Sequence, residues 1–241
     1  MNAMKNLIAM ILFTGFVING YAQSVNNNMD YLEIMDKALY VEYANIRMEV
    51  YKNDKLLKYY GMELYRQGEK MRMEFNEPAV EKGRRILNDE SNLWMYMPRT
   101  SKVMKLPLKQ AFMGSDASNR DLMRMAYKSD YDIISIQSEE ENFVRIELKA
   151  KDLSISYSKM IVSFDIQRRV PVKQEMYSVS DKLIKTMEFE YKKQPDGSYA
   201  CEYMMIRDEL MKNSLTKMYY KDTRKKNQKP AVFFTLGSLK Q

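Results

Sequence analysis

Residues 93–122 read LWMYMPRTSKVMKLPLKQAFMGSDASNRDL. The stretch begins with two short runs, 92–97 and 102–106, in which side chains of different polarity alternate with a period of two. That period is typical of β-strands with one buried face, and the short connection between the runs is typical of a hairpin. We therefore expect antiparallel β-structure at this point of the chain.

A long break, residues 107–127, follows the second run. It exceeds the length of a hairpin loop, and long loops in compact domains are usually either functional or disordered. Ser118 or Asn119 can cap a short helix that ends near Ala126. Because apolar side chains recur through the break, we expect part of it to pack inward, although a solvated surface excursion is the alternative.

The period of two continues on both sides of this stretch. The further runs are 44–51, 56–66, 71–75, 84–87, 132–137, 143–150, 154–165, 170–178, 182–192, 199–207 and 215–220. Turn-forming residues separate them, and no crossover helix lies between them. We expect a mainly β fold with few helices, an antiparallel meander of roughly eleven strands that forms a sandwich or a barrel.

One amphipathic helix is predicted before the first strand. Its apolar side chains recur at helical spacing over 31–39, and charged residues occupy the other face. A single helix cannot bury such a stripe alone, so we expect it to pack on the sheet or close over something.

Residues 1–22 have the order of a secretory signal peptide. Lys5 precedes the apolar run Leu7–Ile18, and Gly20 and Ala22 supply the small residues of a cleavage site. The run is shorter than the ~20 residues that span a bilayer. We expect cleavage before Gln23 and an exported, periplasmic, soluble protein in which residues 23–241 form a single domain; a retained anchor or a buried helix is the alternative.

The composition excludes several kinds of chemistry. The chain has 241 residues and no His, which removes imidazole from any catalytic or zinc-binding scheme. Its one Cys, Cys201, rules out an intrachain disulfide and is expected to be a buried apolar residue. No glycine-rich phosphate loop is present. We expect no catalytic residue, no metal and no cofactor.

The formal net charge of +7 becomes +6 when Lys5 is removed with the leader. Export argues against nucleic acid as the partner, and most of the charges are interspersed. The dense run is 221–229, which is either a solvated loop or a contact for anionic lipid headgroups or an acidic partner.

Residues 93–122 also resemble the signature of the LolA-like outer-membrane lipoprotein-sorting proteins. That signature has a Trp-x-Tyr-x-Pro strand, a basic-apolar strand, Phe-Met-Gly-Ser-Asp and Asp-Leu. The matching residues are Trp94, Tyr96, Pro98, Lys102, Val103, Phe112, Met113, Gly114, Ser115, Asp116, Asp121 and Leu122. Upstream, Glu77-Pro78 and Lys82-Gly83 also fit. The chain departs from the family at 117–119, where an aromatic and an acidic residue are common.

The resemblance implies a curved, incomplete antiparallel β-barrel with a helical lid over an apolar cavity. It also implies a carrier that takes lipid-modified proteins or lipids from an inner-membrane release complex to an outer-membrane acceptor. We expect such a carrier to be a monomer.

Methionine is the residue that suits such a cavity, because it is unbranched, polarizable and flexible. Of the 22 methionines, 19 lie beyond residue 22, and several alternate along the predicted strands. Ordinary core packing is the alternative explanation. The expected acyl-binding residues are Met48, Met71, Met73, Phe75, Leu93, Met95 and Met97, on the strand face opposite Trp94 and Tyr96. The expected gating residues are Phe112, Met113, Leu122 and Met125.

Two other classes of function remain open beside the carrier. One is a regulatory module on the same scaffold that senses lipid or lipoprotein without delivering it. The other is an enzyme that uses the cavity as its active site, which the absence of His and of a convergent acid pair disfavours.

Overall fold

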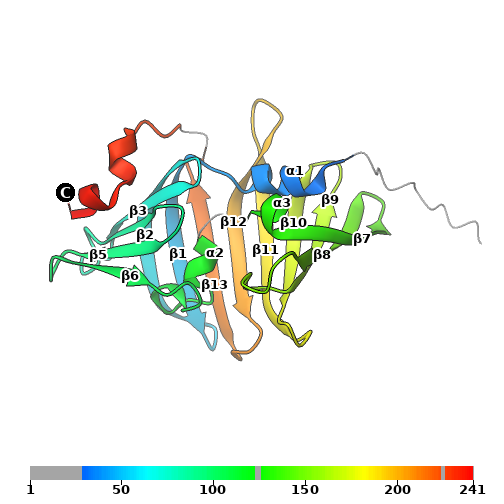
Figure 1. The fold of residues 1–241 in the computed structure, drawn as a ribbon, viewed down its shortest axis with the longest axis horizontal. Helices are drawn as coiled ribbons and strands as arrows, with labels where there is room; N and C mark the ends of the chain where they lie inside the picture. The colour runs from blue at the N-terminus through cyan, green and yellow to red at the C-terminus, as the bar shows by residue number, and fades with distance from the viewer. Residues whose placement is uncertain (1–28, 123–125, 224–225, 241) are drawn as a thin grey trace, which may run out of the picture.

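A computed structural model describes residues 29–122, 126–223 and 226–240. Its strands form one antiparallel sheet of thirteen, which is not closed into a barrel (Figure 1). The strands are β1 (Tyr43–Lys52), β2 (Lys55–Gln67), β3 (Lys70–Glu77), β4 (Arg85–Asn88), β5 (Leu93–Met97), β6 (Lys102–Leu106), β7 (Tyr131–Glu140), β8 (Phe143–Ala150), β9 (Lys159–Asp165), β10 (Val170–Tyr177), β11 (Leu183–Lys193), β12 (Tyr199–Asp208) and β13 (Ser214–Lys221).

The mainly β prediction is confirmed, but the predicted number of strands is too low. Every run with a period of two forms a strand of its own, including the short strands β4, β5 and β6. Strands this short are retained because β4 and β5 pair with a strand on each side, while β6, at the edge of the sheet, pairs with β5 along its whole length.

The strand order is β6-β5-β4-β3-β2-β1-β13-β12-β11-β10-β9-β8-β7. Neighbouring strands are consecutive in the sequence except at one place, where β1 pairs with β13 from Asn45–Lys221 to Lys52–Ser214. The two edges of the sheet are therefore β6 and β7, which follow each other in the sequence. The break at residues 107–130 connects these edges and must cross the sheet to do so.

The break crosses one face of the sheet, which we call the inner face (Figure 1). Its described residues, 107–122 and 126–130, form three short helices, η1 (Phe112–Gly114), α2 (Asn119–Leu122) and α3 (Tyr127–Asp130). The predicted helix start at Ser118–Asn119 is confirmed: the Ser118 N–H donates to Asp121 Oδ2 at 2.7 Å, and the Asp121 N–H donates to Ser118 Oγ at 3.3 Å. Reciprocal bonds of this kind satisfy donors that a helix start leaves open.

The predicted N-terminal helix is α1 (Tyr31–Ala38). Asp30 caps it by accepting the Glu33 N–H at 3.0 Å. Its apolar stripe lies on the inner face, where the ring of Tyr31 meets Phe164 of β9 edge-on with 5.2 Å between centroids. The helix thus adds to the main core, as its amphipathic pattern predicts.

The main core covers the inner face of both halves of the sheet. Leu93 of β5 and Ile146 of β8, on strands near opposite edges, belong to the same cluster of buried side chains. Cys201 is also in this cluster, as expected for an apolar residue.

The opposite, outer face has a second, smaller core that the sequence did not indicate. The short helices η2 (Ala231–Phe234) and η3 (Leu236–Lys240) place Phe234 and Leu239 against Tyr65 and Leu87. The Arg72 guanidinium donates to the Phe233 carbonyl at 3.0 Å and lies 4.1 Å from the centroid of that ring.

The described residues of 221–229 bond to Glu42 and to the end of β2, so this segment is not simply a solvated loop. Lys226 Nζ lies 2.9 Å from a Glu42 carboxylate oxygen, and Asn227 Nδ2 donates to the Arg66 carbonyl at 2.9 Å. The predicted signal peptide, residues 1–22, lies outside the described residues. Within the described residues, no helix has the length and the apolar composition that a bilayer span requires.

Candidate functional site

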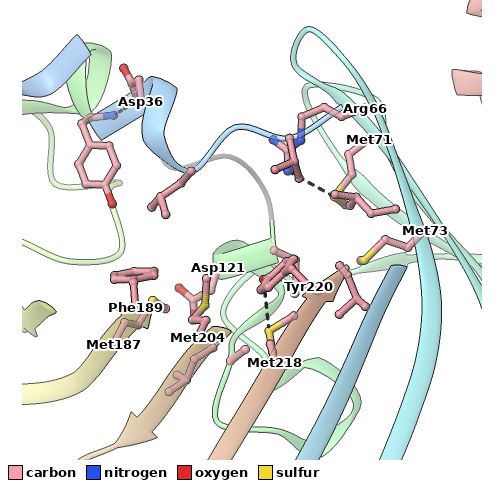
Figure 2. A pocket seen from close by; sticks show the side chains of 18 residues that line it. Asp36, Arg66, Met71, Met73, Asp121, Met187, Phe189, Met204, Met218 and Tyr220 are labelled. Carbon is pink, nitrogen blue, oxygen red and sulfur yellow. Dashed lines mark hydrogen bonds between the residues drawn. The ribbon is translucent and has the colours of Figure 1, made fainter. Parts of the chain in front are cut away.

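A pocket lies on the inner face, between the sheet and the segments that cross it (Figure 2). Strands β1, β2, β3, β11, β12 and β13 line one side of it, and α1, the 39–41 segment, Ala117, α2 and α3 contribute the other lining residues. The lining side chains are Asp36, Leu39, Val41, Ile46, Leu64, Arg66, Met71, Met73, Ala117, Asp121, Leu122, Tyr127, Met187, Phe189, Met204, Ile206, Met218 and Tyr220.

The pocket is lined mainly by flexible apolar side chains. Five methionines come from four strands, β3, β11, β12 and β13: Met71, Met73, Met187, Met204 and Met218. Methionine adapts to irregular apolar shapes because it has three rotatable bonds and no branch. The volume of the pocket, about 100 Å³, is well below the ~300–1,000 Å³ of ordinary ligand pockets.

One buried ion pair fixes α2 beside the pocket. Asp121, whose side chain is 2% exposed, pairs with Lys185 of β11, which is 8% exposed. The Tyr157 hydroxyl donates to the second oxygen of the same carboxylate at 2.7 Å. Burial, together with the charge of Asp121, raises the pKa of Tyr157 well above its ordinary value, so this phenol remains a donor. The carboxylate of the Asp-Leu motif therefore anchors the break at residues 107–130, which we call the excursion, to the sheet.

A second carboxylate joins α1 to α3. Asp36 accepts the Tyr127 N–H at 2.8 Å and the Lys128 N–H at 3.3 Å. The Lys128 ammonium reaches back to Asp30 at 2.7 Å and to Glu33 at 2.8 Å. Chiefly through its hydrogen bond, Lys128 holds the pKa of Asp30 below its usual value. The two helices are thus held together as one cover over part of the inner face.

Arg66 is the basic side chain of the pocket. It is 8% exposed and lies at the end of β2. One of its terminal nitrogens is 3.7 Å from Met71 Sδ (Figure 2). Its guanidinium carbon is 5.8 Å from the centroid of the Tyr40 ring. The arrangement offers an apolar volume with a guanidinium on one side.

All seven residues predicted to bind acyl chains lie on the inner face, but only two line the pocket. Met71 and Met73 do so. Met48, Phe75 and Leu93 are fully buried in the main core, Met95 is partly buried against it, and Met97 is half-buried at the end of β5. Trp94 and Tyr96 face the other way, into the outer core.

The predicted gating residues are spread along the excursion. Leu122 lines the pocket, whereas Phe112 is buried next to Phe75, with 6.2 Å between ring centroids. The Met113 carbonyl accepts a hydrogen bond from Lys58 Nζ at 3.1 Å. Met125 lies outside the described residues.

Most of the pocket comes from residues that the sequence did not single out. Met187, Phe189, Met204, Ile206 and Met218 alternate along the late strands, so their periodicity was visible. Their place beside Met71 and Met73 depends on the pairing of β1 with β13, which no local pattern encodes.

Comparisons with known proteins agree with this fold. Residues 67–241 match the model of a family described as an uncharacterized protein, and the chain belongs to that family. No curated protein sequence matches the chain.

Several solved structures share the architecture. A LolA superfamily protein from Nitrosomonas europaea is 25% identical, with a TM-score of 0.73 over 86% of this chain and 96% of that one. A domain assigned to an outer membrane lipoprotein-sorting protein from Vibrio parahaemolyticus is 21% identical, with a TM-score of 0.73 over 87% and 98%. A DUF1329 family protein from Desulfovibrio piger is 20% identical, with the same TM-score over 87% and 96%. The LolA-like resemblance that residues 93–122 indicate is confirmed.

Proposed function

We propose that residues 23–241 form one periplasmic carrier domain, released from the signal peptide 1–22, that binds acyl chains of lipoproteins or lipids in the inner-face pocket. It works as a monomer and delivers its cargo from an inner-membrane release complex towards an outer-membrane acceptor. The observation that carries the proposal is the pocket lined by methionines from four strands.

The energetics favour such a role for this pocket. Burial of an acyl chain is worth about 0.8 kcal/mol for each methylene, so a long chain gains on the order of 10 kcal/mol. An apolar wall with flexible side chains binds such a chain without directional partners. Binding is then tolerant of the length and identity of the chain.

The pocket must widen to take a long chain, because its volume is only about 100 Å³. The elements beside it are α1 and the excursion. Asp36 joins α1 to α3, and Asp121 pairs with Lys185 of β11. Apolar side chains such as Tyr31 pack into the main core. We assign them the role of a lid that moves when cargo enters.

The predicted acyl-binding residues outside the pocket lie along the path by which the pocket would widen. Met73 pairs across strands with Ile86, and Ile86 pairs with Met95. A chain that displaces the excursion from this face would run from the pocket past Met73 towards Met95 and Met97. Met48, Phe75 and Leu93 would form the floor of the widened cavity.

Two neighbouring methionines of β12 give a matched test. Met204 lines the pocket, whereas Met205 lies on the outer face, opposite Lys217 of β13. The assay is displacement of a fluorescent fatty-acyl probe by a lipopeptide. Met204→Glu puts a carboxylate against the acyl chain, so we expect at least a tenfold loss of affinity, about 1.4 kcal/mol. Met205→Glu should bind as wild type does.

Absence of saturable probe binding by wild type would refute the carrier. Equal binding by both variants would instead place the acyl site elsewhere on the inner face, and Met95→Glu then tests the β5 end of the route. Transfer of bound lipopeptide to acceptor vesicles distinguishes a carrier from a module that only senses lipid, since a sensor binds cargo without passing it on.

A further inference from the structure

Four connections between strands lie side by side at one end of the sheet. They are residues 53–54, 209–213, 178–182 and 151–158. Backbone hydrogen bonds link neighbours: the Asn53 N–H donates to the Asn213 carbonyl at 2.8 Å, and the Glu209 N–H donates to the Ile184 carbonyl at 3.0 Å. The Ser158 N–H donates to the Tyr177 carbonyl at 3.1 Å. We call this end of the sheet the tip end.

The tip end exposes one or more large apolar side chains on or beside each connection. The exposed fractions are 61% for Leu57, 51% for Leu210, 55% for Met211, 78% for Val179 and 88% for Leu153. Exposed apolar side chains are common singly, but their concentration on four adjacent protrusions indicates an interaction surface. Together they form a row of separate apolar points along the tip end.

Each connection also carries an exposed lysine. These are Lys212, Lys182 and Lys151, together with Lys55 directly after residues 53–54. The Lys151 ammonium is engaged within the protein, because it donates to the Lys128 carbonyl at 2.8 Å and lies 3.7 Å from Asp132.

Each connection also carries an acidic residue: Asp54, Glu209, Asp181 and Asp152. Several of the nearby carboxylates are engaged within the protein: Asp208 accepts the Leu210 N–H at 2.9 Å, and Asp181 pairs with Lys159. Lysines that flank apolar tips can reach anionic headgroups while the tips enter the acyl layer.

We propose that the tip end docks on the surface of an anionic lipid bilayer. Side chains on separate protrusions can enter a fluid interface one by one, because a bilayer has no fixed shape to match. A protein partner would instead need a continuous complementary surface. This proposal does not depend on what the pocket binds.

Docking by the tip end also sets the orientation of the pocket. Ile46 and Tyr220, which line the pocket, are paired near the far end of β1 and β13 from the tip end. Strand β1 has ten residues, which span about 30 Å. The segment of residues 39–41 that covers the pocket therefore points away from the docked bilayer, towards a partner in solution.

Flotation with lipid vesicles tests the proposal on the purified chain. The vesicles contain phosphatidylethanolamine with about 30% phosphatidylglycerol, which supplies the negative surface potential. The test variant is Leu57→Ser, Leu153→Ser, Val179→Ser and Leu210→Ser combined. The matched control is Val232→Ser with Leu236→Ser, which removes two apolar side chains, 63% and 43% exposed, from the C-terminal segment. All replaced residues are exposed, so both variants should keep the fold.

We expect the wild type and the control to float with the vesicles. The partition coefficient of the tip variant should fall at least tenfold, about 1.4 kcal/mol. In the variant Leu153→Trp, the fluorescence emission of the new tryptophan should shift to the blue when vesicles are added. In Leu236→Trp, the emission of the new tryptophan should not shift. Lys55→Gln, Lys182→Gln and Lys212→Gln combined should remove the dependence on phosphatidylglycerol.

Three results would overturn the proposal. The first is no flotation of the wild type, and the second is equal flotation of the tip variant. The third is a dimer in sedimentation velocity that only the tip variant dissociates, because the tip end would then bind a second copy of the chain. If the tip end does not dock on vesicles, the pocket can still bind the acyl probe. The docking proposal and the carrier proposal can therefore be refuted independently.

Discussion

Asp116 and Thr216 exchange two hydrogen bonds across 100 residues of sequence. The Asp116 N–H donates to Thr216 Oγ1 at 2.9 Å, and the Thr216 hydroxyl donates to Asp116 Oδ2 at 2.6 Å. Both residues are buried, with Thr216 on β13 and Asp116 on the excursion. The Gly-Ser-Asp part of the motif thus fixes the excursion to the middle of the sheet.

Thr216→Val should destabilise the protein by about 1–3 kcal/mol, because it keeps the shape of the side chain but leaves a buried N–H and a buried carboxylate without their partner. Urea unfolding measures the change. Thr216→Ser retains the hydroxyl and is the control, with a loss well below that of Val. A Thr216→Val variant as stable as wild type would mean that the two hydrogen bonds do not stabilise the fold.

Lys185→Met should cost about 3–5 kcal/mol, because it leaves the buried Asp121 carboxylate without its counter-charge. Lys182 is an exposed lysine directly before the same strand, β11. The control Lys182→Met should change the free energy of unfolding by less than about 0.5 kcal/mol. Combining Lys185→Met with Asp121→Asn should recover much of the loss, which a double-mutant cycle in urea would show. If the double variant is no better than Lys185→Met, the ion pair does not anchor α2.

Gly114 has both a left-handed backbone and a close neighbouring atom, whereas Gly197 has the left-handed backbone alone. Gly114 has φ +70° and a β-carbon there would lie 2.7 Å from Lys58 Nζ, whereas Gly197 has φ +84° with open space around it. Gly197→Ala should therefore cost about 1 kcal/mol for the left-handed backbone alone. Gly114→Ala should cost more, and Lys58→Ala in the same chain should return it to the Gly197→Ala value. Equal effects of the two single variants would show that Lys58 moves aside freely.

Cys201 should resist thiol reagents in the folded protein. Burial raises the pKa of its thiol to about 12, from an ordinary value of 9.0, so the reactive thiolate is on the order of a thousandfold rarer. Labelling by iodoacetamide at mildly alkaline pH should be slow until urea unfolds the chain. Because only the unfolded thiol loses its proton just above its ordinary pKa, Cys201 also lowers the free energy of unfolding as the pH rises from 9.0 towards 12. Cys201→Ala should show a shallower alkaline decline.

The sequence predicted the local structure well, because period-two alternation and helix caps are local signals. The helix at 31–38, the start of α2 at Asn119 and the strand around Met95 all follow from such signals. The sequence also separated Leu93 and Met95 from Trp94, since neighbours on a strand face opposite ways.

Contacts between distant segments were not predictable in this way. The pairing of β1 with β13 and the ion pair of Asp121 with Lys185 join residues whose local patterns are unrelated. The C-terminal segment was missed because η2 and η3 are too short to show a period. Phe234 has a place to pack only once Tyr65 and Leu87 are brought together on the outer face.

If α1 is part of a lid, weakening its hold on α3 should speed the entry of cargo. Asp36→Ala removes the acceptor of the Tyr127 and Lys128 N–H groups, so the cover should open more often while the apolar floor is unchanged. Stopped-flow association of the acyl probe should become several-fold faster, since a carrier that binds only when open has an apparent rate set by its open fraction. Glu33→Ala, on the exposed side of α1, removes one contact of Lys128 that is worth at most about 1 kcal/mol and should leave the rate nearly unchanged. An unchanged rate for Asp36→Ala, with probe affinity intact, would show that cargo enters past another element, and Lys185→Met with Asp121→Asn would then test the excursion at α2.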